Sequence, residues 1–167
     1  VEAAMRLARE CGCTVVLNPA PACEIPDEML ALADYVTPNE TECEFFTGVY
    51  CRDFADVPSW CAAAGRAMHA RGVKRLIITL GEHGSYYSDG ETAFMLPAFK
   101  ISAVDSTAAG DAFNGGFVCA LSRGADVKAA MRYASACGAI TASRRGSLPS
   151  LPDAAEVEQF LKEHMEV

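Results

Sequence analysis

Apolar and polar residues follow one another along this chain with two periods, one helical and one extended. The first eleven residues place apolar side chains at the i, i+3, i+4, i+7 spacing of an amphipathic helix, at Ala4, Leu7, Ala8 and Cys11. The mostly apolar runs 14–17 and 75–80 instead predict buried strands. Because helical and extended segments alternate, the pattern predicts an α/β fold with a mostly parallel central sheet.

The remaining elements follow from the same pattern and from turn residues. Helices are predicted at 27–33, 39–46, 58–71, 110–122, 126–142 and 153–165, and a short strand at 34–37. Segment 51–57 is predicted to be a loop. Asp89-Gly90 lies between two short strand-like segments, 85–88 and 92–96, which is typical of a β-hairpin. Gly48 and Gly72 stand where C-caps are expected.

Composition narrows the class of protein. The chain has 167 residues, half of them hydrophobic, and a net charge of −8, which argues against a nucleic-acid partner. No apolar run approaches the roughly 20 residues that span a bilayer, so no membrane partner is expected. The eight cysteines show no paired metal-ligand spacing, which favours reduced thiols in a cytoplasmic protein over a zinc site.

The most informative segment runs from Asp105 to Gly116. It places the small residues Ala108-Ala109-Gly110 directly before Asp111, at the start of a predicted helix. A helix N-terminus offers unpaired N–H groups and a positive dipole, which suit an anion. A carboxylate beside such an anion site suggests phosphoryl transfer to a hydroxyl, with Asp111 as general base. The alternative is that Asp111 only stabilises the helix start.

Two other segments follow predicted strands, where open α/β sheets bind ligands. Asn39 and Glu42 share the first turn of a helix, where they could hold a hydrated Mg²⁺ or form a capping box. The segment 79–84 could approach a ligand through its two glycines or simply form a tight turn. His83 is read as catalytic in one interpretation and as a surface-loop histidine in the other. Asp105 similarly is either a cap of backbone N–H groups or a cation ligand.

Together these segments resemble the ribokinase-like (PfkB) family of carbohydrate kinases. The family's second signature is similar to Asp105-Ser-Thr-Ala-Ala-Gly-Asp111 followed by Asn114-Gly-Gly116. Three further segments resemble, in the same order, those of ribose-phosphorylating members: 17–22, 37–42 and 78–81. The resemblance implies a three-layer αβα fold with a mostly parallel sheet and a β-hairpin. It also implies that residues 1–167 are the C-terminal part of a single kinase domain, without the N-terminal sugar-binding half and lid.

The resemblance further implies ATP-dependent phosphorylation of a sugar, D-ribose to ribose 5-phosphate. Asp111 would be the base that contacts the sugar hydroxyl, and Ala108, Ala109 and Gly110 would form the anion hole. The implied ATP contacts are Asn39, Thr79, Leu80, Gly81, Glu82, His83, Gly84, Gly110, Asp111 and Ser135. Glu42 would act on the Mg²⁺ side. The implied ligands of a K⁺ ion are Asp105, Thr107, Thr141, Arg144, Gly146 and Ser150.

Three alternatives stay open at this point. The acceptor could be fructose, adenosine or another nucleoside instead of ribose. The chain could be a truncated nucleotide-binding fragment without activity. Since family members often dimerise through their lid, a homodimer is expected only of a longer protein.

Overall fold

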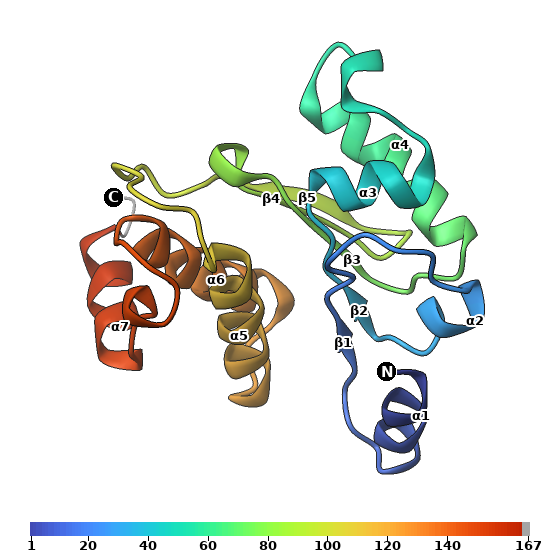
Figure 1. Ribbon diagram of the computed structural model, residues 1–167, viewed down its shortest axis with the longest axis horizontal. Helices are drawn as coiled ribbons and strands as arrows, with labels where there is room; N and C mark the ends of the chain where they lie inside the picture. Colours follow the sequence, from blue (N-terminus) through green and yellow to red (C-terminus); the bar gives the residue numbers. More distant parts are fainter. Residues whose placement is uncertain (165–167) are drawn as a thin grey trace. The chain divides into compact units, whose positions relative to one another are not determined.

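The computed structural model describes residues 1–164 and groups them into two compact units (Figure 1). The first unit contains Val1–Leu80 and Tyr86–Met95. The second contains Gly81–Ser85 and the chain from Leu96 onward. No helix among the described residues is both long and apolar enough to cross a bilayer.

A five-stranded sheet of order β1-β2-β3-β4-β5 organises the first unit. Its strands are β1 (Val16–Leu17), β2 (Tyr35–Val36), β3 (Leu76–Thr79), β4 (Ser85–Ser88) and β5 (Ala93–Leu96). The pairs β1–β2 and β2–β3 are parallel, with Val16 opposite Tyr35 and Val36 opposite Leu76. A tight turn, in which the Asp89 N–H donates to the Thr92 carbonyl over 3.1 Å, joins β4 to β5. So short a connection makes the last pair antiparallel.

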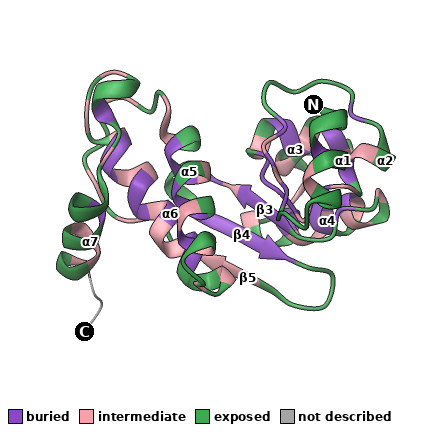
Figure 2. Cartoon of the chain, turned by 90° about the horizontal axis from the view of Figure 1, so that it is seen from below, coloured by how far each residue is buried: buried purple, intermediate pink, exposed green. Residues whose placement is uncertain are grey.

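Four helices complete the first unit: α1 (Glu2–Glu10), α2 (Asp27–Leu30), α3 (Glu40–Thr47) and α4 (Val57–Ala70). Helices α3 and α4 pack against each other and against β3. The fully buried Trp60 of α4 donates its indole N–H to the Val49 carbonyl at 2.9 Å. Figure 2 shows β3 and β4 as the buried strands: β3 is mostly apolar, whereas β4 buries Ser85 and Ser88 together with two tyrosines.

Three helices dominate the second unit: α5 (Ala109–Ser122), α6 (Val127–Ala142) and α7 (Ala154–Glu163). Helices α5 and α6 pack side by side, and α7 packs on α6. Ala136, Cys137 and Ile140 of α6 and Val157 of α7 belong to one buried cluster. Asp126 and Asp153 cap α6 and α7, because each side chain accepts a backbone N–H three residues later.

The sequence pattern predicted the order and type of these elements. The predicted and observed elements differ in where they begin and end. Strand 14–17 is paired only at Val16–Leu17, and helix 27–33 ends at Leu30. The loop predicted at 51–57 contains a 3₁₀ turn at Cys51–Asp53. The predicted helix 153–165 ends at Glu163, and its last position lies outside the described residues.

The apolar face predicted for α1 is largely exposed. Leu7 is 60 % exposed, and Met5, which is not on the predicted face, is the buried residue of the helix. Helix α1 therefore touches the core of its unit along a narrow line. The i, i+3, i+4 spacing located the helix correctly, but of the predicted apolar face only Ala8 packs against the core, beside Met5.

Gly116 allows α5 and α6 to approach closely. A Cβ at Gly116 would lie 2.6 Å from the Cys137 Sγ and 3.1 Å from the Ala134 Cα, whereas a Cβ at the neighbouring Gly115 would meet nothing within 4 Å. We expect Gly116→Ala to lower the free energy of unfolding by about 0.5–2 kcal/mol, because overpacking outweighs the better helix propensity of alanine.

The matched control is Gly115→Ala on the same helix. It should raise the free energy of unfolding by about 0.5–1 kcal/mol, because alanine restricts the unfolded chain and favours helix. Urea denaturation of both variants measures the difference. If both substitutions change the free energy of unfolding in the same direction, α5 does not pack as closely on α6 at Gly116 as the structure has it.

Candidate functional site

The start of α5 has a backbone conformation that leaves N–H groups free. Ala108, its N-cap, has φ 62° and ψ 6°, and is the single non-glycine residue with positive φ among residues 1–164. The Ala109 N–H donates to the Ser106 carbonyl, and the Ala112 N–H to the Ala108 carbonyl. Between them, the N–H groups of Gly110 and Asp111 reach no acceptor within the described chain. These two donors are available to an anion.

Asp111 lies in the first turn of α5, beside those donors. Its side chain is exposed and makes no hydrogen bond or ion pair with residues 1–164. The carboxylate is thus free to accept a proton from a ligand. An anion-binding backbone and a free carboxylate on one helical turn can hold a phosphoryl group and a hydroxyl close together.

The space above this turn is open. A Cβ at Gly110 would meet nothing within 4 Å. The Asn114 amide donates to the Gly110 carbonyl over 3.0 Å, one turn into the helix. The small side chains predicted to be important here therefore leave the backbone approachable. The left-handed conformation of Ala108 was not predicted, and the run of small residues was the sequence signal for it.

Asp105 connects two loops of the second unit. Its Oδ1 accepts the Thr107 N–H at 3.0 Å and its Oδ2 accepts the Gly146 N–H at 3.1 Å. Hydrogen bonds from Thr107, and then from Gly146, lower the pKa of the Asp105 carboxyl below its ordinary value. The capping role predicted as one alternative is therefore present.

The other residues implied for a monovalent cation lie around the C-terminal end of α6. The N–H groups of Val104 and Asp105 donate to the Ala142 carbonyl, and the Arg144 N–H donates to the Thr141 carbonyl. The Arg144 guanidinium pairs with Glu156 at 2.6 Å, while the Ser150 hydroxyl donates to the Ser147 carbonyl. The structure thus brings these loops together.

One atom in this region suggests a missing partner. Thr141 is fully buried, and its Oγ1 has no hydrogen-bond partner within residues 1–164. A buried hydroxyl without a partner is costly, and a hard cation accepts oxygen ligands. Oxygen atoms at Asp105, Thr141 and Ser150 are the donor type that such a cation takes. No group of three or more His, Cys, Asp or Glu side chains within residues 1–164 is arranged for a metal ion.

Asn39 and Glu42 form the capping box of α3. The Glu42 N–H donates to the Asn39 side chain at 2.8 Å, and the Asn39 N–H donates to the Glu42 carboxylate at 2.9 Å. Glu42 is buried, and Asn39 forms a parallel bridge with Thr79 at the end of β3. The capping alternative is therefore confirmed, and the bridge places the capping box beside the end of β3.

The segment after β3 is a tight turn. Gly81–His83 forms a 3₁₀ turn, and the Gly84 N–H donates to the Gly81 carbonyl at 3.2 Å. Glu82 and His83 are exposed, as predicted in the interpretation of a surface loop.

Ser135 lies half-buried on α6. An irregular stretch, and not a strand, directly precedes Asp105.

Comparison with known proteins gives one consistent result. A family model described as pfkB family carbohydrate kinase matches residues 1–154. A ribokinase of Haemophilus influenzae is 42 % identical over 162 residues, which are 97 % of this chain and 52 % of that protein. A ribokinase structure from Thermotoga maritima has a TM-score of 0.83 at 37 % identity, covering 95 % of this chain and 52 % of that one.

A further solved structure is the Arabidopsis thaliana ribokinase complexed with ribose and ATP. It has a TM-score of 0.87 at 29 % identity and covers 95 % of this chain and 50 % of that one. The chain thus spans about half the length of the curated relatives it matches.

Proposed function

The chain belongs to the pfkB family of carbohydrate kinases, and from this premise we propose that it carries the phosphoryl-transfer part of an ATP-dependent sugar kinase. The acceptor we propose is D-ribose and the product ribose 5-phosphate, in line with the similarity to ribokinases. The observation that carries the proposal is the start of α5. There, two unpaired backbone N–H groups lie beside the free carboxylate of Asp111.

In this mechanism Asp111 accepts the proton of the sugar hydroxyl as the hydroxyl oxygen attacks the γ-phosphorus, and the bond from that phosphorus to the β,γ-bridging oxygen breaks, so that ADP leaves. The N–H groups of Gly110 and Asp111 stabilise the charge on the transferring phosphoryl oxygens. The Ala109 N–H already bonds to Ser106, so Ala108 and Ala109 contribute the backbone shape of this anion hole. An open space at Gly110 lets the phosphoryl group come within hydrogen-bond distance.

The proposed ATP contacts are Asn39, Ser135 and the segment 79–84, and Glu42 is proposed to act on the Mg²⁺ side. Magnesium bound with ATP would neutralise phosphate charge, and it needs few protein ligands. The Asn39–Glu42 capping box positions both side chains before any ligand arrives.

A cytoplasmic location belongs to the same proposal and is supported by the eight free thiols. A homodimer of a longer protein stays a prediction.

For the acceptor, the test is a competition among D-ribose, fructose, adenosine and a second nucleoside. We expect ribose to have the highest kcat/KM. Because the chain spans half the length of its relatives, the assay is run on residues 1–167 and, side by side, on any longer chain that contains them. Activity of the longer chain alone would mean that the sugar site needs residues outside 1–167. A better acceptor among the other three would replace ribose in the proposal.

A K⁺ ion is the proposed activator at the loops joined by Asp105. We expect K⁺ to raise turnover, and Asp105→Ala to abolish that response, because the variant removes a carboxylate from the proposed ligand set. Asp126→Ala is the matched control, since Asp126 also accepts a backbone N–H but at the other end of α6. Equal K⁺ responses in Asp105→Ala and in the unmodified protein would remove Asp105 from this role.

A further inference from the structure

A side-chain amide is bonded to the backbone of the turn that opens α5. Asn114 follows Gly110 by one helical turn, and its Nδ2 donates to the Gly110 carbonyl oxygen at 3.0 Å. Because a carbonyl oxygen can only accept, the side chain presents its amide nitrogen at this place and not its amide oxygen. The hydrogen bond therefore connects Asn114 to the backbone that forms the anion site.

The Gly110 carbonyl belongs to the same peptide group as the Asp111 N–H. A peptide group is planar, and its C=O and N–H point in opposite directions. The Asp111 N–H is one of the two donors at the start of α5 that reach no acceptor among residues 1–164. A partner that fixes the carbonyl therefore also fixes the direction of this N–H, which points out of the N-terminal end of the helix.

The same oxygen accepts two donors, and both come from one residue. In an α-helix the N–H of residue i+4 donates to the carbonyl of residue i, and for Gly110 that residue is again Asn114. The side-chain amide takes the second lone pair of the oxygen. Because linked hydrogen bonds polarise one another, a doubly bonded carbonyl makes the N–H of its own peptide group a stronger donor.

The residues of this turn do not fix the peptide group by themselves. Glycine restricts its own backbone less than other residues, so rotation about the Cα–C bond of Gly110 is loosely set. Ala108 has φ 62°, a left-handed conformation that strains an alanine. A Cβ at Gly110 would meet nothing within 4 Å, so packing does not hold the turn on that side. The amide of Asn114 supplies a contact that does.

Helix stability alone does not favour asparagine at this position. Asparagine is a weaker helix former than alanine, because its side chain competes for backbone groups. Asn114 is only half-buried, so its side chain adds little to the core. Replacing it by alanine should therefore keep or raise the stability of α5. A role in the anion site and a role in folding thus predict opposite changes in stability.

We propose that Asn114 is a positioning residue for phosphoryl transfer. Its amide holds the peptide group between Gly110 and Asp111 with the Asp111 N–H toward the transferring phosphoryl group, and strengthens that donor. This inference rests on the proposed kinase function and adds a residue that acts through the backbone. Because the charge on the phosphoryl oxygens changes during transfer, the effect belongs to kcat and not to the binding of ATP.

The test compares Asn114→Ala with Asn114→Ser, in residues 1–167 and in any longer chain that contains them. A serine hydroxyl in a helix can donate to the carbonyl four residues earlier, so the serine variant keeps a donor to Gly110 and the alanine variant has none. We expect Asn114→Ala to lower kcat by about tenfold and to change the dissociation constant for ATP by less than about twofold. Its thermal midpoint should not fall, and Asn114→Ser should recover most of the lost turnover.

Ser122→Ala is the matched control. It also removes a side-chain donor to a carbonyl of α5, that of Cys119 at 2.8 Å, but at the other end of the helix. It should keep kcat within about twofold of the unmodified protein.

A second measurement needs no turnover. In the NMR spectrum of the unliganded protein, the carbonyl carbon of Gly110 and the amide nitrogen of Asp111 report on the hydrogen bond from Asn114. Both resonances should move in Asn114→Ala and return toward their original positions in Asn114→Ser.

Four results would overturn the role of Asn114 while leaving the kinase function standing. They are an unchanged kcat in Asn114→Ala, an equal loss in Asn114→Ser, a thermal midpoint that falls together with kcat, and unmoved resonances of Gly110 and Asp111. Absence of sugar phosphorylation by every unmodified chain would contradict the proposed function itself, and the role of Asn114 would fall with it.

Discussion

Asp111→Asn is expected to lower turnover by about 10²–10⁴-fold while changing the dissociation constant for ATP by only a few-fold. Asparagine preserves the shape of the side chain but cannot accept the proton of the sugar hydroxyl. The backbone N–H groups of Gly110 and Asp111 are unaffected by the substitution, so the phosphate contacts should persist. Steady-state kinetics with calorimetric measurement of ATP binding separates the two effects.

The control for this variant is Asp153→Asn, which also neutralises an exposed carboxylate at the start of a helix, α7. Because Asp153 serves only as a cap in this account, its variant should keep turnover within about twofold. A loss of ATP binding in Asp111→Asn would show that Asp111 is structural. Full activity in that variant would show that another group takes the proton.

The second large effect is expected at Gly84, at the end of the turn after β3. Gly84 has φ 94°, and a Cβ there would overlap the Leu96 carbonyl oxygen and lie 2.8 Å from the Ala98 nitrogen. Because backbone atoms cannot rotate away, Gly84→Ala should lower the free energy of unfolding by at least about 3 kcal/mol. That loss corresponds to about 6–12 °C in the thermal midpoint of a chain of this length.

Gly81→Ala is the matched control in the same turn. Gly81 also has a positive φ, 52°, but a Cβ there would meet nothing within 4 Å. Only the conformational cost remains, about 1–2 kcal/mol. Thermal unfolding of both variants followed by circular dichroism is the measurement. Equal shifts of the thermal midpoint in Gly84→Ala and Gly81→Ala would mean that the contact of Gly84 with the 96–98 segment does not exist in solution.

Much of the fold was predictable because the signals are local. Capping side chains such as Asn39 and Asp153, and the turn residues Asp89-Gly90, act within a few residues of the chain. The sequence pattern therefore located the helices and the hairpin to within a few residues. The short length of β1 and the exposed side of α1 were not predictable, because both depend on which distant residues pack against them.

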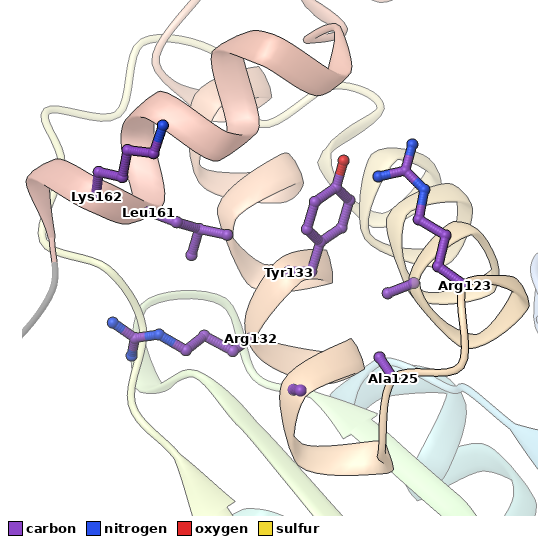
Figure 3. Close-up of a pocket in the computed structure, with 8 residues that line it drawn as sticks. Arg123, Ala125, Arg132, Tyr133, Leu161 and Lys162 are labelled. Carbon is purple, nitrogen blue, oxygen red and sulfur yellow. The ribbon is translucent and has the colours of Figure 1, made fainter.

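The free backbone N–H groups at the start of α5 were predictable for the same local reason. Small residues before Asp111 indicated an approachable backbone, and the structure has free N–H groups there. Other features needed the folded chain. The link from Asp105 to Gly146 spans 41 residues, and the unpartnered Thr141 hydroxyl is recognisable only from its burial. The hollow drawn in Figure 3 likewise combines residues of α5, α6 and α7, and no sequence motif marks it.

The most direct test of the central claim is a ³¹P NMR spectrum of residues 1–167, and of any longer chain that contains them, with ATP, Mg²⁺ and D-ribose. We expect a phosphomonoester signal coupled to the C5 protons of ribose, growing in step with ADP. Release of inorganic phosphate without a sugar phosphate, or no turnover of ATP with any pentose, hexose or nucleoside, would contradict the account.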